Sequence, residues 1–396
     1  MLRNIWRTDV LKIISLLCWC LALFCYFFQV PFRELAKFIA PSFLLFFIFH
    51  FLKLKIKVAK LYLLILFLYF LCLGIEVFQS GLRNTEISSV IRFLEILCMI
   101  PLCCFIREKE FNRYFFITVF FAVLKSLMLI GIGLYLIRIG SHSVMRNWIF
   151  SISGGDIYLS HGIPKVQLQG NGILPIIFIL YCSKYKRIDF VSFILFLGVF
   201  FAGNFAFYLA IFCFIGLVIF ETIKKDKKSY KISLIFFLLL LVSPFLLRYV
   251  EKKIEEKSVY SNAIRIEQAE VLLDTNWFVG KGLGNKVVGG GHYRSYNGDN
   301  YFELQTLYIF NQIGFVGLFL FYIVTIFGIY NVKFQRKRIL LYFIYLFYTF
   351  WNPYCFDTTQ MMTLVLLINT DLEKNSSQMK QSLKIQRKLC LNYFLK

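Results

Sequence analysis

Long apolar stretches separated by short polar ones run along almost the whole chain. Four of the clearest cover residues 10–30, 62–78, 114–137 and 232–247. Each is close to the roughly 20 residues that an α-helix needs to cross about 30 Å of hydrocarbon. The pattern predicts an all-α polytopic membrane protein, because helices satisfy their own backbone hydrogen bonds inside lipid.

Placing a helix in every such stretch gives about twelve transmembrane helices that alternate with polar segments. The predicted spans are residues 10–30, 35–51, 59–80, 87–106, 114–137, 168–183, 189–203, 205–222, 231–249, 302–330, 338–352 and 354–370. Both chain ends then face the cytoplasm, and residues 371–396 form a basic cytoplasmic tail. Two tight turns, near Asn204 and Pro353, leave open whether the helices beside them cross fully or only half-way.

Composition and charge agree with this arrangement. The 396 residues are 59% hydrophobic and 19% aromatic, with a mean hydropathy of +0.69, which is more apolar than an ordinary soluble domain. The formal net charge of +22 would indicate a nucleic-acid partner in a soluble protein, but most of the 44 Lys and Arg cluster at every second position between spans. The charge therefore marks cytoplasmic loops, and we expect no nucleic-acid partner.

The 11 cysteines lie mostly inside apolar spans, and no CxxC pair stands beside histidines. We therefore expect free cysteines that pack as small apolar side chains, with no metal and no cofactor. The first apolar run is too long for a signal peptide and lacks a small-residue cleavage site, so we expect it to be retained as an anchor.

Two predicted exported loops are long enough to carry a site, a shorter one at 138–169 and a main one at 249–301. The main loop holds seven Lys and Arg. Long exported segments are exempt from the positive-inside rule, and one this basic indicates an anionic ligand. Its first part, Glu251 to Leu273, has apolar residues at helical spacing and predicts an amphipathic helix on the membrane surface. The glycines that follow, from Gly280 to Gly291, exclude a helix there.

The glycine turn Trp277-Phe-Val-Gly-Lys-Gly-Leu-Gly-Asn285 is not a nucleotide-binding loop, because it matches neither GxGxxG nor GxxxxGK[ST]. Two interpretations stay open at this point. The turn either closes over a lipid-linked sugar or diphosphate, or re-enters the membrane for purely structural reasons.

The order of features in this region resembles a known family. Arg265 is followed by the glycine turn and then by Asp299-Asn-Tyr-Phe-Glu-Leu, which leads into a span with Gly314 and Gly317. This resembles the C-terminal half of the O-antigen polymerase and ligase superfamily, which shows an Arg, a glycine-asparagine turn and a His-Asn or Asp-Asn segment before a G-x-x-G span. The resemblance covers about residues 255–325 by motif and the whole chain by topology.

The resemblance implies a GT-C-like membrane glycosyltransferase of the bacterial inner membrane. Such proteins act at the periplasmic face on undecaprenyl-diphosphate-linked oligosaccharides, without metal or nucleotide sugar. The expected partners are this lipid-linked oligosaccharide, the lipid bilayer and a chain-length regulator. The implied function is a surface polysaccharide polymerase that transfers a glycan to the non-reducing end of a lipid-linked repeat unit.

Two alternatives to a polymerase stay open. A ligase passes the glycan to lipid A core and carries a His before the Asn of the motif, whereas this chain has Asp299 before Asn300. A transporter of lipid-linked oligosaccharides usually shows two related halves with paired broken helices, which the sequence lacks. The polymerase is therefore the preferred hypothesis.

The chemistry of glycan transfer points to specific side chains. A departing diphosphate needs cations, and Arg265 is the first candidate because Arg binds phosphate oxygens bidentately. The acceptor hydroxyl needs a base, and Asp299 and Glu303 are spaced i, i+4 at the start of a span, so we expect both on one helical face. Helix capping explains Asp299 nearly as well. The predicted substrate-binding residues are Arg138, Arg146, Lys281, His292, Arg294 and Asn300.

Three further positions bear on this hypothesis. The superfamily often has an Arg in the tight exported turn before the main loop, where this chain has Gly203-Asn204. Within the spans, Arg92 and Glu95 are spaced i, i+3, which leaves two interpretations open, an internal ion pair or the lining of a cavity for diphosphate. Lys125 has no local acidic neighbour, which favours a diphosphate-facing role over a structural one.

Overall fold

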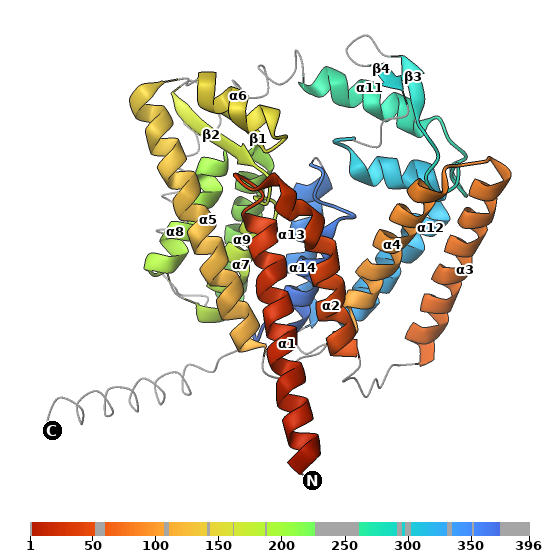
Figure 1. The fold of residues 1–396 in the computed structure, drawn as a ribbon, viewed down its shortest axis with the longest axis horizontal. Helices are drawn as coiled ribbons and strands as arrows, with labels where there is room; N and C mark the ends of the chain where they lie inside the picture. Colours follow the sequence, from red (N-terminus) through yellow and green to blue (C-terminus); the bar gives the residue numbers. More distant parts are fainter. Residues whose placement is uncertain are drawn as a thin grey trace, which may run out of the picture. The chain divides into compact units, whose positions relative to one another are not determined.

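The computed structural model describes residues 2–51, 60–106, 111–140, 143–160, 162–186, 188–225, 261–290, 295–297, 302–330, 335–350 and 352–372. This part is mostly helical and contains two short β-hairpins (Figure 1). The chain divides into two compact units that alternate along the sequence. Unit 1 comprises Met1–Phe46, Arg107–Ala202 and Asn369–Lys396, and unit 2 comprises Phe47–Ile106 and Gly203–Ile368.

Among the described residues, four helices are long and apolar enough to cross a membrane. They lie in α1 (Leu2–Phe27), α3 (Lys60–Leu82), α5 (Asn112–Ile139) and α12 (Gln305–Tyr330). Four apolar helices are shorter: α7 (Leu174–Tyr185), α8 (Phe190–Ala202), α9 (Phe205–Lys225) and α14 (Thr358–Asn369). Together they describe a helical membrane protein, while the span predicted at 231–249 lies outside the described residues.

Unit 1 is built around aromatic contacts near the start of the chain. Trp19 on α1 is fully buried, and its ring packs on Phe43 and Phe46 of α2 (Ile39–Phe51). The indole Nε1 donates to Thr118 Oγ1 of α5 at 3.0 Å. A short 3-10 helix, η1 (Arg33–Phe38), precedes α2. The span predicted at 35–51 therefore begins in this 3-10 helix and becomes an α-helix only at Ile39.

Helices α5 and α8 approach closely because both present small residues at their contact. A Cβ at Gly133 would lie 2.1 Å from the Phe201 ring, and a Cβ at Gly198 would lie 2.2 Å from Ser126 Oγ. Small residues at such contacts are typical of helix pairs in membranes, where packing rather than water expulsion holds helices together.

The shorter predicted loop has regular structure. It contains α6 (Ser143–Ser151) and an antiparallel hairpin of β1 (Gly155–Ser160) and β2 (Ile163–Leu168), in which Gly155 pairs with Leu168. The span predicted at 168–183 is therefore wrong at its start, since β2 ends at Leu168 and α7 begins at Leu174. Asn171 stabilises the turn between them, because its side-chain Nδ2 donates to the Val166 carbonyl at 2.9 Å and its backbone carbonyl accepts the Leu174 N–H at 3.0 Å.

Unit 2 packs α3 and α4 (Ile87–Cys103) against α12, and packs α9 against α13 (Gln335–Phe350), as Figure 1 shows. Tyr69 of α3 contacts Phe321 of α12, and Phe207 of α9 meets Tyr348 of α13 edge-on. The unit also contains α11 (Ser261–Leu273), β3 (Val288–Gly290), β4 (Ser295–Asn297) and α14.

Helix α12 is broken at Gly314, which has φ 63° and ψ −173°. The prediction of one continuous helix over 302–330 is therefore wrong, and the two parts run in different directions (Figure 1). The amides that the break releases find partners outside the helix, since Phe315 N donates to Trp277 O at 2.7 Å and Val316 N to Phe278 O at 3.2 Å. The glycine turn thus completes the hydrogen bonding of α12, as buried backbone requires.

Candidate functional site

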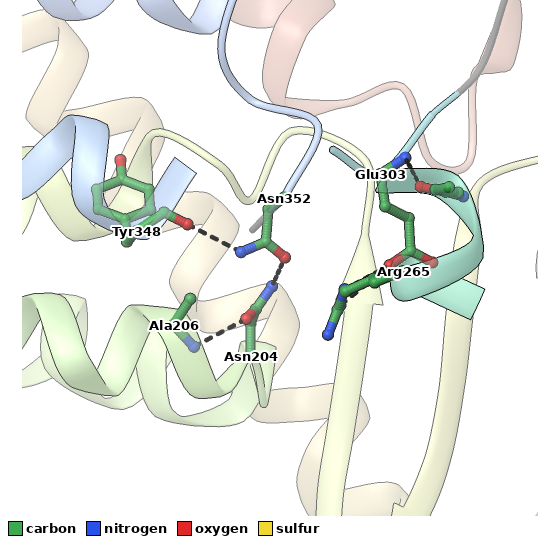
Figure 2. Close-up of polar contacts among 7 residues, drawn as sticks. Asn204, Ala206, Arg265, Glu303, Tyr348 and Asn352 are labelled. Carbon is green, nitrogen blue, oxygen red and sulfur yellow. Dashed lines mark hydrogen bonds and ion pairs between the residues drawn. The ribbon is translucent and has the colours of Figure 1, made fainter. Parts of the chain in front are cut away.

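Arg265 on α11 forms an ion pair with Glu303, which lies just before α12 (Figure 2). Its Nε and Nη2 both lie 3.0 Å from Glu303 Oε2. The two side chains are 18% and 34% exposed, so solvent or a ligand reaches both. The structure therefore brings together two of the three predicted catalytic residues, from positions 38 residues apart.

A hydrogen-bonded contact between α11 and the first part of α12 fixes this pair. Gln268, one turn after Arg265, is fully buried and accepts the Glu303 backbone N–H through Oε1 at 3.2 Å. Asn311 Nδ2 donates to the Leu272 carbonyl at 2.8 Å. The two helices are thus joined at two points, one next to the ion pair and one about a turn further along α11.

The prediction that Glu303 shares a helical face with Asp299 is wrong, because α12 begins only at Gln305. The amide of Glu303 bonds to the Gln268 side chain and not to a helical carbonyl. Glu303 consequently points to Arg265 from non-helical backbone. Asp299 itself lies outside the described residues.

The glycine turn packs directly against other parts of the protein. Gly280, Gly282 and Gly284 have φ of 72°, 87° and 72°, a backbone conformation that residues with a side chain rarely adopt. The turn lies against α12, where Lys281 N donates to Asn311 O at 2.8 Å and Gly282 N to Gln312 O at 2.9 Å. It also contacts α3, since Ser80 Oγ donates to the buried Leu283 carbonyl at 2.8 Å. This geometry supports the structural interpretation of the turn.

The cations of the turn are engaged with protein groups. Lys281 Nζ lies 3.4 Å from Asp274 Oδ2, and its carbonyl accepts a hydrogen bond from Arg83 Nη1 at 2.8 Å. Lys286 Nζ lies 3.6 Å from Glu86, whose pKa is lowered by a hydrogen bond from Ser88 and by the charge of Lys286. The substrate-binding role of Lys281 stays a prediction.

Arg146 of α6 is held by the unit 1 hairpin. Its Nε and Nη2 bond to the two carboxylate oxygens of Asp156 at 2.7 and 2.9 Å, and its guanidinium lies over the Tyr158 ring at 5.5 Å. The Asp156 carboxylate raises the pKa of Arg146. Arg138, in the last turn of α5, is exposed. These two candidates belong to unit 1, whereas Arg265 and Glu303 belong to unit 2.

The remaining predicted substrate-binding residues are not placed by the structure. His292, Arg294 and Asn300 lie outside the described residues, as does Asp299. Within the part that is described, no group of three or more His, Cys, Asp or Glu side chains gathers that would hold a metal ion. None of the described cysteines forms a disulfide.

The charged residues inside the predicted spans have structural surroundings. Lys125 is fully buried in α5, and its Nζ donates to the Gln169 carbonyl at 3.0 Å, which ties α5 to the turn before α7. This contact favours a structural role over the predicted diphosphate-facing one. Arg92 and Glu95 are both exposed on α4, and no ion pair joins them within this described helix, so the interpretation as an internal pair is wrong.

The turn at Asn204, where the superfamily often has Arg, makes a contact that the sequence did not predict. Asn204 Nδ2 donates to Asn352 Oδ1 at 2.8 Å, while its Oδ1 accepts the Ala206 N–H and caps α9 (Figure 2). Asn352 Nδ2 donates in turn to the Tyr348 carbonyl at 2.9 Å. Asn before an apolar run is a helix-capping signal, but its pairing with a residue 148 positions away has no sequence signal.

An open apolar groove of about 620 Å³ lies between α9 and α13, and neither Arg265 nor Glu303 lines it. Its described lining is apolar: Cys213, Leu217, Leu340, Phe343, Ile344, Leu346, Phe347 and Phe350. Such a surface suits hydrocarbon and offers no group for acid-base chemistry. Among the described residues, Arg265 and Glu303 therefore remain the candidate catalytic groups.

Comparison with known proteins gives no family assignment. No family profile, curated protein or solved structure matches the chain. The candidate site therefore rests on the side chains of this chain and on the geometry that joins them.

Proposed function

We propose that the chain is a membrane-bound polysaccharide polymerase. It would transfer a glycan from undecaprenyl diphosphate to the non-reducing end of a lipid-linked repeat unit, at the periplasmic face of a bacterial inner membrane. The observation that carries this proposal is the part-buried Arg265–Glu303 ion pair, formed by two residues of the motif-bearing segment. A cation and a carboxylate in contact are the two groups that such a transfer needs.

Arg265 would stabilise the departing diphosphate. Its guanidinium has further N–H donors beyond the two that Glu303 accepts, and Arg matches phosphate oxygens in a bidentate geometry. Because negative charge grows on the diphosphate as the anomeric bond breaks, a cation already in position lowers the barrier most. Its partial exposure leaves a route for the substrate.

Glu303 would orient Arg265 and accept the proton of the acceptor hydroxyl. Both contacts from Arg265 go to Oε2 of Glu303, so Oε1 is not part of the ion pair. A carboxylate that is held by a cation on one oxygen keeps the other as a hydrogen-bond acceptor. The Gln268 contact to the Glu303 amide fixes the distance between the two groups.

Asp299 before Asn300 supports the polymerase over the ligase, since ligases of the resembling superfamily carry His there. The expected partners remain the lipid-linked oligosaccharide, the bilayer and a chain-length regulator. The ligase is the alternative, because it uses the same donor and the same charge chemistry with another acceptor.

The test is the length of the surface glycan in cells that depend on this protein. We expect Arg265→Ala and Glu303→Gln to reduce the glycan to core carrying a single repeat unit. Losing a charge-stabilising donor slows such reactions by about 10²–10³-fold, and losing a general base slows them by about 10²–10⁴-fold. Lys286→Ala and Glu270→Gln are matched controls, since Lys286 and Glu270 are exposed residues of the same unit. Both controls should keep long glycan.

The same measurement of glycan length distinguishes the polymerase from the ligase. Loss of even the single repeat unit in Arg265→Ala would indicate the ligase. Long glycan of normal length distribution from Arg265→Ala, with the protein present in the membrane, would exclude a catalytic role for this residue.

A further inference from the structure

Two large aromatic side chains of the glycine turn are largely exposed. Trp277 and Phe278 are 60% and 71% exposed, although one edge of Trp277 meets the Phe310 ring at 5.8 Å. Their backbone is nevertheless fixed, because their carbonyls accept the Phe315 and Val316 amides and because Asn276 Oδ1 accepts the Phe278 N–H at 3.1 Å. The hydrogen bonds of the turn therefore hold these two side chains in exposed positions.

The same aromatic surface continues onto α12. Immediately after the break, Phe315, Val316 and Phe319 are 55%, 40% and 53% exposed. The rings of Phe315 and Phe319 stack at 5.6 Å, so this face begins where the glycine turn touches the helix. We name the surface formed by Trp277, Phe278, Phe315, Val316 and Phe319 the aromatic rim.

Two observations identify what covers the aromatic rim. It is continuous with the exposed face of the part of α12 that follows the break, residues 315–330, which is the larger part of a helix whose sequence is apolar enough to span a membrane. Basic residues also belong to the same turn, since Lys281 follows Trp277 by four residues and its carbonyl accepts a hydrogen bond from exposed Arg83. Trp next to apolar rings and basic side chains is typical of the boundary between acyl chains and phospholipid headgroups.

We infer that the aromatic rim is a lipid-binding surface that sets the edge of the hydrocarbon layer at the Gly314 break. Acyl chains cover Phe278, Phe315, Val316 and Phe319, and Trp277 lies at their junction with the headgroups. The part of α12 before Gly314, together with α11, then lies in the headgroup layer and not in hydrocarbon.

This placement has a consequence for the ion pair. Arg265 and Glu303 are fixed to the first part of α12 through Gln268 and Asn311, so they share its depth. Headgroup depth is where a phosphate-bearing lipid carries its charge. The inference concerns the position of the protein in the bilayer and holds whether or not the chain transfers glycans.

The test is the quenching of Trp277 fluorescence in the full-length protein reconstituted into phosphatidylcholine nanodiscs. The chain has five Trp, so the signal of Trp277 is the difference between the wild type and Trp277→Phe. We expect loss of most of this difference signal in lipids brominated near the carbonyl end of the acyl chain, and little loss on adding aqueous iodide. Trp19→Phe is the control, because Trp19 is fully buried and its signal should respond to neither quencher.

A second measurement uses single substitutions of exposed residues, which do not disturb packing. Labelling by a water-soluble maleimide is measured as the increase over the wild type, whose own cysteines also react. Phe278→Cys should add little labelling in nanodiscs, while Asp274→Cys, at a position where the Asp274 side chain is 90% exposed, should add a full label. Quenching of Trp277 by iodide, or equal labelling at the two cysteines, would place the rim in water and overturn the inference. Protection from both iodide and bromolipid would assign the rim to a contact with protein and would overturn it equally.

Discussion

Gly280 and Gly314 face each other so closely that neither tolerates a side chain. A Cβ on either residue would lie 2.6 Å from the backbone amide nitrogen of the other. Both have positive φ, 72° at Gly280 and 63° at Gly314. The glycine turn and the break in α12 are thus two sides of one contact.

We predict that Gly280→Ala and Gly314→Ala each lower the stability of the protein by about 1–3 kcal/mol, the cost of a side chain in backbone conformations that favour glycine. The measurement is thermal unfolding of the purified full-length variants. Gly131→Ala on α5 is the control, because a Cβ there meets nothing within 4 Å and Ala favours helix. An unchanged unfolding temperature for Gly314→Ala would contradict the contact.

The Asn204–Asn352 hydrogen bond predicts energetic coupling between two turns of unit 2. Asn204→Ala and Asn352→Ala should each destabilise the protein by about 0.5–2 kcal/mol, since one removes a helix cap and both break a side-chain hydrogen bond. The double variant should lose less than the sum of the two, because the shared bond is lost only once. Additive losses in the unfolding measurement would show that the two side chains act separately.

Lys125 allows a test between structural and substrate-binding roles. Lys125→Met keeps the length of the side chain and removes a buried amine that has a carbonyl partner at 3.0 Å. We expect equal or higher thermal stability and normal glycan length, because burying an apolar isostere avoids the desolvation cost of a charge. Lys125→Ala should be less stable through the cavity it leaves. A stable Lys125→Met protein that makes no polymer would show that Lys125 contacts substrate.

Arg146 is predicted to support the unit 1 hairpin and not the reaction. Arg146→Ala and Asp156→Asn both remove the bidentate ion pair, so both should loosen the hairpin, with a loss of about 1 kcal/mol or less for exposed groups. Arg146→Ala should cost slightly more, because it also removes the contact with the Tyr158 ring. Glycan length should be normal in both variants. Loss of polymer in Arg146→Ala alone would indicate instead that Arg146 binds the substrate.

The helices were largely predictable because apolar length is a local property. The expected spans at 59–80 and 87–106 correspond to α3 at Lys60–Leu82 and α4 at Ile87–Cys103. The break in α12 was not predictable in the same way. A lone Gly in an apolar run is compatible with a continuous helix, and its conformation here is decided by Trp277 and Phe278, which lie far upstream in the sequence.

The candidate site was predictable in its residues but not in its arrangement. Charge and the resemblance singled out Arg265 and Glu303, yet their pairing depends on how α11 lies on α12. The role of Gln268 had no sequence signal, because a buried glutamine that accepts a backbone amide looks like any other polar residue on an amphipathic helix. Tertiary hydrogen bonds of this kind join positions that no local pattern connects.

The alternation of the two units along the chain has a consequence for biosynthesis. Helices α3 and α4 belong to unit 2, but their partner α12 is made only after all of Arg107–Ala202. During translation these early helices must therefore wait for roughly 200 residues before Ser80 meets Leu283. A ribosome that stops before α12 would release α3 and α4 without the surface against which they pack, which makes incomplete chains natural substrates for membrane quality control.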